Sequence, residues 1–244
     1  MHLVADLHVH TTASGHAYST IKENLSAARW RGLKMIAITD HGPSLPGGPD
    51  ISYFGYLQVL PEVEDGVELL VGVEANIMDV EGSLDLSERY LNMLDIVLAG
   101  FHPPCYLSGT KKENTRALVN TIKNPLVDVI AHPGNPAFPI DFEEVVAACK
   151  ENNCALEINN SSLSGGARRG SCENCLQIAR AAAREKVLVS IGSDAHYTDR
   201  VGRFEVVLDL LDKAGISDEQ VLNTSVDKIK SFLRGKGKLG GRLF

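Results

Sequence analysis

Histidines and carboxylates in this sequence recur at a spacing that suits metal binding. His8 and His10 are two residues apart in D-L-H-V-H, and Asp194 and His196 repeat that spacing in G-S-D-A-H. Because side chains two residues apart in a strand point to the same side, each pair can present two ligands together. Imidazole and carboxylate ligands without cysteine favour zinc, manganese or iron over magnesium or calcium.

Five further candidate ligands follow apolar runs, or lie in the loop just after one. They are His16, His41 in T-D-H, Glu74 in G-V-E-A-N, His102 in A-G-F-H and His132 in A-H-P-G-N. One histidine in such a position is usually a core or loop residue. Seven of the eight histidines placed this way predict a shared metal cluster, because packed imidazoles and carboxylates without a metal would leave desolvated polar groups.

Seven short apolar runs are the expected strands that position these groups. The runs cover residues 3–7, 35–39, 69–73, 96–99, 127–131, 155–158 and 187–191. Nearly continuous apolarity over such lengths is typical of parallel strands that are buried on both faces. Amphipathic stretches and capping signals between the runs predict helices over residues 20–31, 142–150, 173–184, 203–214 and 227–233.

The alternation of strands and helices predicts an α/β fold, with residues 1–244 forming one domain. No repeat or Pro/Gly/Ser linker divides the chain. About seven βα units favour a TIM-like barrel, and a doubly wound open sheet is the alternative. A barrel would bring the carboxyl ends of all strands, and with them the candidate ligands, to one rim.

Composition narrows the function classes. The net charge of -7 argues against a broad duplex-binding surface. No apolar run approaches the roughly 18 residues of a membrane span, and no secretory leader is recognised, so we expect a cytoplasmic protein. Five cysteines fit reduced thiols. Cys172 and Cys175 form a lone C-x-x-C, which we expect to be neither a zinc site nor a redox pair, because a second C-x-x-C and a thioredoxin-like strand are missing.

The motifs together resemble those of the polymerase-and-histidinol-phosphatase (PHP) family. They are D-L-H-V-H, T-D-H-G-P, G-V-E-A-N, A-G-F-H, A-H-P-G-N, E-I-N-N-S-S and G-S-D-A-H, and they span almost the whole chain. The segment G-H-A-Y-S-T is most similar to that of the stand-alone bacterial phosphatases of the YcdX type. This resemblance implies a distorted (βα)7 TIM-like barrel, the PHP fold, with a trinuclear metal site that usually contains zinc.

The resemblance also implies which residues hold the three divalent ions. His8, His10, Glu74 and Asp194 would hold the first ion; Glu74, as a bridge, would hold the second with His102 and His132; and His16, His41 and His196 would hold the third. The sequence lacks no member of this set. We therefore expect an active enzyme rather than an inactive relative.

Three residues that are not ligands are candidates for a catalytic role. Asp40 lies beside a candidate ligand and could orient an imidazole, as could Asp6. Asn159 ends the sixth run and could donate hydrogen bonds to substrate, while Arg168 could bind phosphate oxygens through its guanidinium fork. Each has an ordinary alternative as a cap, a turn residue or a solvated surface charge.

These features predict hydrolysis of a phosphate monoester on a small molecule by water that the metal ions activate. Two ions sharing a carboxylate can clamp a phosphoryl group and acidify water. The alternatives are a histidinol-phosphate phosphatase, a PHP-type nuclease acting on nucleic-acid ends, and a metal-binding protein without catalysis. The negative charge and the 6% aromatic content disfavour nucleic acid. We expect the protein to bind a small phosphate ester and not to bind a membrane. The sequence leaves open whether the chain forms a homo-oligomer.

Overall fold

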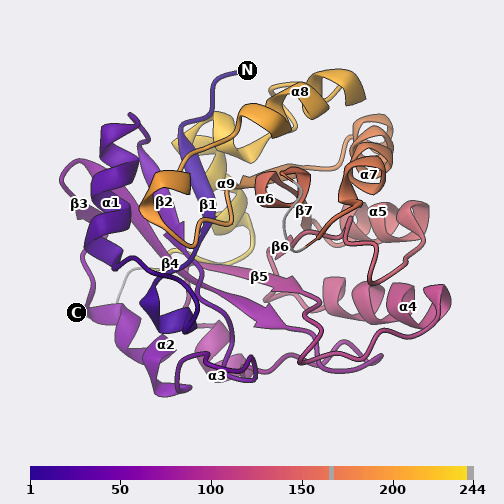
Figure 1. Cartoon of the computed structure of the whole chain (residues 1–244), viewed down its shortest axis with the longest axis horizontal. Helices are drawn as coiled ribbons and strands as arrows, with labels where there is room; N and C mark the ends of the chain where they lie inside the picture. The colour runs from indigo at the N-terminus through magenta and orange to yellow at the C-terminus, as the bar shows by residue number, and fades with distance from the viewer. Residues whose placement is uncertain (165–167, 241–244) are drawn as a thin grey trace.

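Seven parallel strands form the centre of the fold in the computed structural model, which describes residues 1–164 and 168–240 (Figure 1). The predicted domain of residues 1–244 thus includes two segments, 165–167 and 241–244, that lie outside the described residues. The strands run in the order β1 (Ala5–Val9), β2 (Met35–Ile38), β4 (Val67–Asn76), β5 (Ile96–Gly100), β6 (Val129–Ile130), β7 (Ala155–Asn159) and β8 (Val189–Gly192). Each overlaps a predicted run. A short strand that was not predicted, β3 (Val63–Glu64), pairs antiparallel with β4.

The five predicted helices are confirmed, with small shifts at their ends. They are α1 (Ile21–Trp30), α5 (Phe142–Glu151), α7 (Ser171–Glu185), α8 (Glu205–Ala214) and α9 (Val226–Gly235). Thr20 and Glu23 form a capping box at the start of α1, and the Asp141 side chain accepts a hydrogen bond from the Glu144 backbone N–H at the start of α5. The predictions did not include α4 (Lys111–Ile122) or the short helices α2 (Ser52–Tyr56), α3 (Glu88–Leu91) and α6 (Asn160–Leu163).

The sheet curves until β8 approaches β1, which makes a nearly closed α/β barrel. At the carboxyl end the backbone N–H of His10 donates to the Ala195 carbonyl over 2.9 Å, and that of Asp194 donates to the His8 carbonyl over 2.9 Å. At the other end the Asn223 side chain lies between the two strands, where its amide donates to the carbonyls of Ala5 (3.0 Å) and Ile191 (2.8 Å). The barrel prediction is confirmed, and the open-sheet alternative is wrong.

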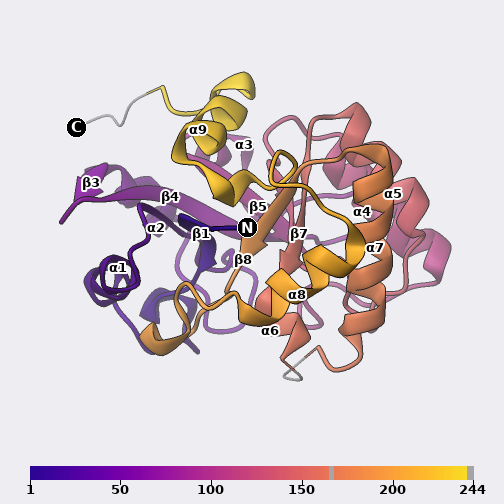
Figure 2. The same cartoon turned by 90° about the horizontal axis from the view of Figure 1, so that it is seen from above.

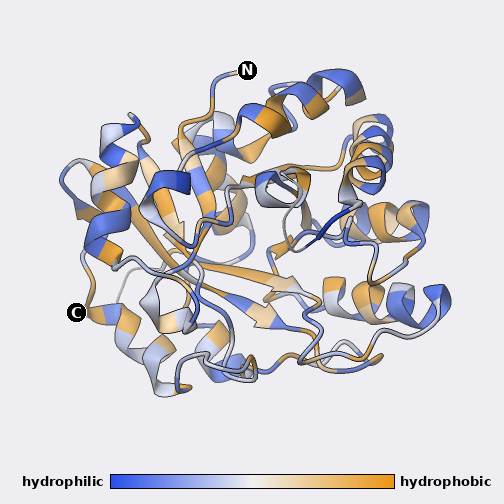
Figure 3. Cartoon of the chain, in the orientation of Figure 1, coloured by the Kyte–Doolittle hydropathy of each residue, from blue (hydrophilic) through white to orange (hydrophobic). Residues whose placement is uncertain are grey.

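Apolar side chains pack on both sides of the strands. Inside the barrel, side chains such as Leu7, Met35 and Leu98 meet Phe232 and Leu233 of α9, which covers the amino ends of the strands. Figure 2 shows α9 and α6 on opposite sides of the strands. Outside the barrel, alternate strand residues pack against the surrounding helices. Figure 3 shows predominantly hydrophobic strands and helices of mixed hydropathy, as this arrangement requires. Within the described residues, no helix has the length and apolarity needed to cross a membrane.

Candidate metal centre

Strand alternation explains why the candidate ligands face the barrel interior. In β4, Leu70 points inward, so Glu74 does as well, and in β5 the inward Leu98 likewise aligns with His102. In β1, however, Leu7 lies in the interior cluster while Val9 lies in the outer one. A β-bulge between residues 6 and 9 changes the register of β1 against β2, and it turns the even-numbered residues inward from position 8.

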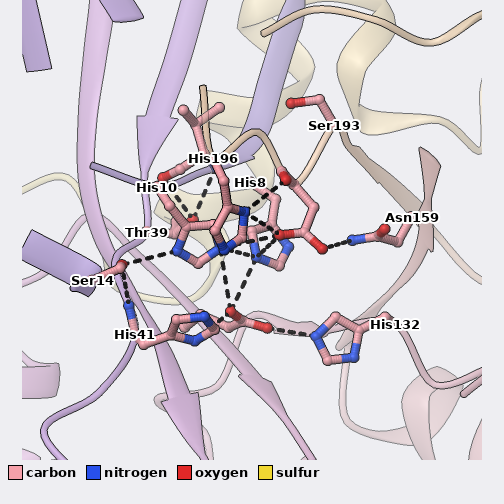
Figure 4. Close-up of polar contacts among 12 residues, drawn as sticks. His8, His10, Ser14, Thr39, His41, His132, Asn159, Ser193 and His196 are labelled. Atoms are coloured by element: carbon pink, nitrogen blue, oxygen red, sulfur yellow. Dashed lines mark hydrogen bonds and ion pairs between the residues drawn. The ribbon is translucent and has the colours of Figure 1, made fainter. Parts of the chain in front are cut away.

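One buried carboxylate lies at the centre of the histidines. Five imidazole nitrogens lie around Glu74. Figure 4 shows His8, His10, His41 and His132 gathered in this cluster. Glu74 Oε2 is 3.2 Å from His8 Nε2, 3.4 Å from His10 Nε2 and 2.8 Å from His41 Nδ1; Glu74 Oε1 is 3.1 Å from His102 Nε2 and 2.6 Å from His132 Nε2. All six residues are buried. The fold thus gathers residues that are up to 124 positions apart in the sequence around one side chain.

A second carboxylate, Asp194, joins the cluster from the end of β8. Its Oδ1 lies 3.2 Å from His10 Nε2, 3.8 Å from His8 Nε2 and 3.5 Å from His196 Nδ1. The other oxygen pairs with the Arg168 guanidinium. Asp194 has a positive φ of 56°, which is uncommon for a residue other than glycine. The backbone N–H of Asp194 donates to the His8 carbonyl of β1, and this hydrogen bond holds Asp194 in place.

His16 and His196 lie farther out, at the open side of the cluster. The His16 ring stacks on His41 with centroids 5.1 Å apart, and its centroid is 4.9 Å from that of His196. His16 is exposed and His196 is half-buried, whereas the other predicted ligands are buried. All nine predicted ligands are therefore close together, with these two facing solvent.

Three groups of side chains in the described part of the chain have ligand atoms within 4.8 Å of one another. The groups are His8, His10 and Asp194; His41, Glu74 and His102; and His10, His41 and His196. His16 and His132 lie outside these groups, although His132 contacts Glu74. His41 belongs to two of these groups, one with Glu74 and one with His196, whereas the family resemblance assigns it to the third ion with His16 and His196. The assignment of ligands to individual ions stays a prediction.

The hydrogen bonds around the cluster fit bound cations. Glu74 Oε2 is buried and accepts no hydrogen bond within residues 1–164 and 168–240. His8 Nδ1 lies 2.7 Å from Glu157 Oε1, and His10 Nδ1 lies 3.1 Å from Ser14 Oγ. Imidazoles that donate from Nδ1 direct the lone pairs of Nε2 at the carboxylate oxygens, an arrangement that repels without a cation between them. The donor set therefore suits divalent metal ions.

The electrostatic environment keeps most of these groups in the form that binds metal. His8 is the exception: burial lowers its pKa, but Glu157, Glu74 and Asp194 together outweigh burial and hold that pKa well above its ordinary value. Burial, followed by the neighbouring His41 and His196, holds the pKa of His10 well below its ordinary value. Burial, followed by Arg168, lowers the pKa of His132 to about 4. Burial alone would raise the pKa of Asp194, but Arg168, His8 and His10 together outweigh burial and hold that pKa well below its usual range. Neutral imidazoles and ionised carboxylates are the ligating species.

Glu157 is a supporting residue that sequence reasoning missed. Its Oε1 lies 2.7 Å from His8 Nδ1, and its Oε2 accepts hydrogen bonds from the backbone N–H of His132 (2.8 Å) and from Asn159 Nδ2 (3.1 Å). Gly192 leaves room for this contact, because a Cβ there would lie 2.2 Å from Glu157 Oε1. The signal was the period of two in β7, where the inward Ala155 aligns with residues 157 and 159.

Asp40 acts on the cluster through an intermediary. Its carboxylate accepts hydrogen bonds from Thr11, from Ser14 Oγ (2.6 Å) and from the Tyr53 hydroxyl (2.7 Å). Ser14 Oγ in turn lies 3.1 Å from His10 Nδ1, so Asp40 has the position of a residue that orients His10. Asp6 accepts backbone N–H groups from the ends of β8 and the following loop, which is a structural role.

Asn159 and Arg168 lie against Asp194. Asn159 is fully buried; its amide donates to Asp194 Oδ2 over 3.3 Å, and its Oδ1 caps α6 by accepting from the Ser162 N–H. These contacts hold Asp194 and leave Asn159 little capacity to bind a substrate directly. Arg168 is partly buried; it donates to Ser162 Oγ, pairs with Asp194 and lines the pocket beside the cluster.

A pocket of about 1000 Å³ opens over the cluster. Its lining includes His41, His102 and Asp194 of the cluster, together with Tyr18 and Tyr197. Concave sites with a few polar groups at the bottom and apolar walls are typical of small-molecule binding. The arrangement can therefore hold a small anionic ligand against the candidate metal centre.

Comparisons with known proteins agree with this geometry. Residues 6–161 match the PHP domain family. A protein of Thermoanaerobacter sp. (strain X514) named "Probable phosphatase" is 53% identical over 99% of both chains, and one of Caldanaerobacter subterraneus subsp. tengcongensis with the same name is 54% identical over 99% of this chain and 95% of its own.

A solved structure shares the fold at low sequence identity. The histidinol phosphate phosphatase of Lactococcus lactis subsp. lactis, complexed with zinc, L-histidinol and phosphate, superimposes with a TM-score of 0.62 at 18% identity and covers 87% of this chain and 94% of its own. Together, the family match, the close relatives and the shared barrel establish that this chain belongs to the PHP domain family.

Proposed function

We propose that this protein is a metal-dependent phosphatase that hydrolyses phosphate monoesters of small molecules at a trinuclear site. The observation that carries the proposal is the convergence of nine imidazole and carboxylate side chains in one cluster, five of which line one pocket. The relatives' names and the zinc and phosphate in the Lactococcus structure support the same chemistry. The ions are zinc in the simplest case, with manganese or iron as alternatives.

The nine predicted ligands would hold the ions, and bound divalent ions would supply Lewis acidity to the phosphoryl group and acidify the attacking water. The chain's own residues set up that chemistry. Glu157 fixes the ring of His8, and Asp40 fixes that of His10 through Ser14, so that each Nε2 faces the centre.

Arg168 has the position of a phosphate-binding residue. It lines the pocket beside Asp194, and its Nε is fixed by Ser162 Oγ at 2.8 Å. A guanidinium held in this way can donate its remaining N–H groups to phosphoryl oxygens and stabilise the charge that develops during hydrolysis. The pairing with Asp194 orients both groups and neutralises the arginine until a phosphate binds.

Metal analysis and a phosphatase assay together test the proposal. Wild type, His132→Ala and Asp194→Asn are purified, their metal content is measured, and each is assayed with 4-nitrophenyl phosphate. His2→Ala is the matched control, because His2 is exposed and lies outside the cluster. We expect both site variants to lose metal and activity while the control retains both. Full activity in both variants, or after exhaustive chelation, would end the proposal.

A substrate panel separates the phosphatase proposal from its alternatives. Histidinol phosphate is compared with sugar phosphates, nucleotides and a labelled oligonucleotide. Selective turnover of histidinol phosphate would identify the narrower phosphatase. Degradation of the oligonucleotide that Asp194→Asn abolishes would instead indicate a nuclease.

A further inference from the structure

Three arginines line the pocket, and they differ in how their charge is balanced. Arg168 pairs with Asp194, and Arg200 Nε lies 3.6 Å from a carboxylate oxygen of Asp199. Arg203 has no ion pair with a carboxylate among residues 1–164 and 168–240; its Nε donates instead to the Asp199 backbone carbonyl over 2.7 Å. Within the described parts of the chain, Arg203 is therefore the pocket arginine without a carboxylate partner.

The chain holds Arg203 in place before any ligand binds. Its backbone N–H donates to the Arg200 carbonyl over 3.0 Å, and the preceding Gly202 N–H donates to Asp6 Oδ2 over 2.8 Å. Asp6 and Val201 are both fully buried, so this loop is anchored to β1 and to the core. Because Nε is occupied by the backbone, the two terminal nitrogens form the edge left for a ligand. Fixing the side chain in advance reduces the entropy lost on binding.

The walls of the pocket suit an organic group between two charged ends. Tyr18 and Tyr197 are 76% and 54% exposed, and Phe101, Pro103 and Pro104 complete the apolar lining. Large exposed aromatic side chains that share a pocket offer flat contact surfaces to a ligand. The candidate metal centre would take one anionic group at the floor, and Arg203 lies elsewhere on the lining.

We propose that Arg203 forms a subsite for a second anionic group, so that the preferred substrate is a phosphate monoester carrying a carboxylate or a further phosphate. This inference rests on the proposed function, because that function puts the first phosphate at the metal centre. Arg203 is a specificity-determining residue in this scheme: it binds the part of the substrate that does not react. A guanidinium edge matches the paired oxygens of either anion.

Binding of stable phosphonates to the metal-loaded protein tests the subsite. Calorimetry measures the binding of three probes: benzylphosphonate, 4-carboxybenzylphosphonate and 1,4-xylylenediphosphonate. A second set, in which a biphenyl group replaces the single ring, covers a longer distance between the two anionic groups. We expect at least one probe with two anionic groups to bind about 10-fold more tightly than the matched probe with one anionic group. The carboxylate and phosphonate probes identify which anion the subsite prefers.

Variants assign the preference to the residue. Arg203→Ala should remove the preference for the second anionic group, and Arg203→Lys should restore part of it. Arg116→Ala is the control and should keep the preference, because Arg116 is an exposed residue of α4 that pairs with Glu81. Unfolding midpoints verify that all variants are folded. Equal affinity for both probe types in wild type, or a preference that survives in Arg203→Ala, would overturn the subsite.

The same samples separate this inference from the phosphatase proposal. Wild type is assayed in parallel with 4-nitrophenyl phosphate. Turnover without any preference for doubly anionic probes would mean that the enzyme assignment holds and the subsite is wrong. A preference that depends on Arg203, without turnover of any ester, would mean that the subsite holds and the proposed reaction is wrong.

Discussion

The two ends of the barrel both bury charged groups, and they stabilise them in different ways. At the amino end, Asp128 is fully buried, accepts a hydrogen bond from the Val97 N–H and lies within 4.0 Å of the ammonium groups of Lys236 and Lys238. At the carboxyl end, Glu74 is equally buried, but within residues 1–164 and 168–240 its carboxylate has imidazoles, and no lysine or arginine, within 4.0 Å.

This difference indicates a division of work between the ends. The amino end balances its charge with its own side chains and is covered by the apolar face of α9. The carboxyl end has groups that suit cations from solution. Changes at the amino end should therefore alter stability, and changes at the carboxyl end should alter activity, as in other barrels of this architecture. Four predictions test that division.

The largest effect is expected from Glu74→Gln. Removing the central carboxylate should lower phosphatase activity by more than about 100-fold. Substitution of a residue that merely orients a metal ligand already lowers metal affinity or activity by about 10- to 100-fold. The metal-free protein should stay folded, because glutamine keeps the size of the side chain and can still form hydrogen bonds with the imidazoles. Activity is measured with 4-nitrophenyl phosphate and unfolding by circular dichroism in urea. A large loss of stability in the metal-free variant would contradict the division.

Leu233→Ala should have the opposite profile. Leu233 is fully buried where α9 covers the strands, and truncating it should lower the free energy of unfolding by about 2–5 kcal/mol. The folded fraction should retain wild-type kcat at low temperature. Leu107→Ala is the control, because Leu107 is 93% exposed and should change stability by less than about 0.5 kcal/mol. Equal stability losses in the two variants would show that α9 contributes no packing energy.

Asp128 gives the amino end a pH dependence. Burial raises its pKa from the ordinary value of 3.8 to about 6 despite the two lysines. A carboxyl group with a raised pKa in the folded state destabilises the fold as it ionises, so its contribution falls between pH 4 and pH 7. The free energy of unfolding of wild type relative to Asp128→Asn should fall across that range by up to roughly 3 kcal/mol.

Urea unfolding at several pH values measures this change. Asp209→Asn is the control, because Asp209 is exposed on α8. A relative stability that rises between pH 4 and pH 7 would mean that Lys236 and Lys238 outweigh the burial of Asp128.

Glu157→Gln should have the smallest effect of the four. The variant keeps the size of the side chain and removes the charge that faces His8 Nδ1, so we expect zinc affinity to fall by about 10- to 100-fold. Competition with a chelator of known affinity measures the change, and Glu173→Gln on the exposed surface of α7 is the control. Unchanged affinity would show that Glu157 serves the fold rather than the metal centre.

The sequence predicts the strands and the central cluster because both follow short-range patterns. Apolar runs mark the strands, and the candidate ligands follow them in recognisable motifs. Residues in contact with the cluster were harder to predict. Tyr53 reaches Asp40 from a helix that has no strong periodic signal, so only the folded chain reveals the contact. Glu157 has the period expected of an inward residue of its strand, but no spacing to another ligand distinguishes it from an ordinary strand residue.

The bulge in β1 determines which residues of that strand face the candidate metal centre. The strand begins with odd-numbered residues facing inward and ends with even-numbered ones facing inward. If β1 alternated without interruption from Leu7 onward, His8 and His10 would both point to the helical layer. Such a chain could still form its barrel, as an inert scaffold.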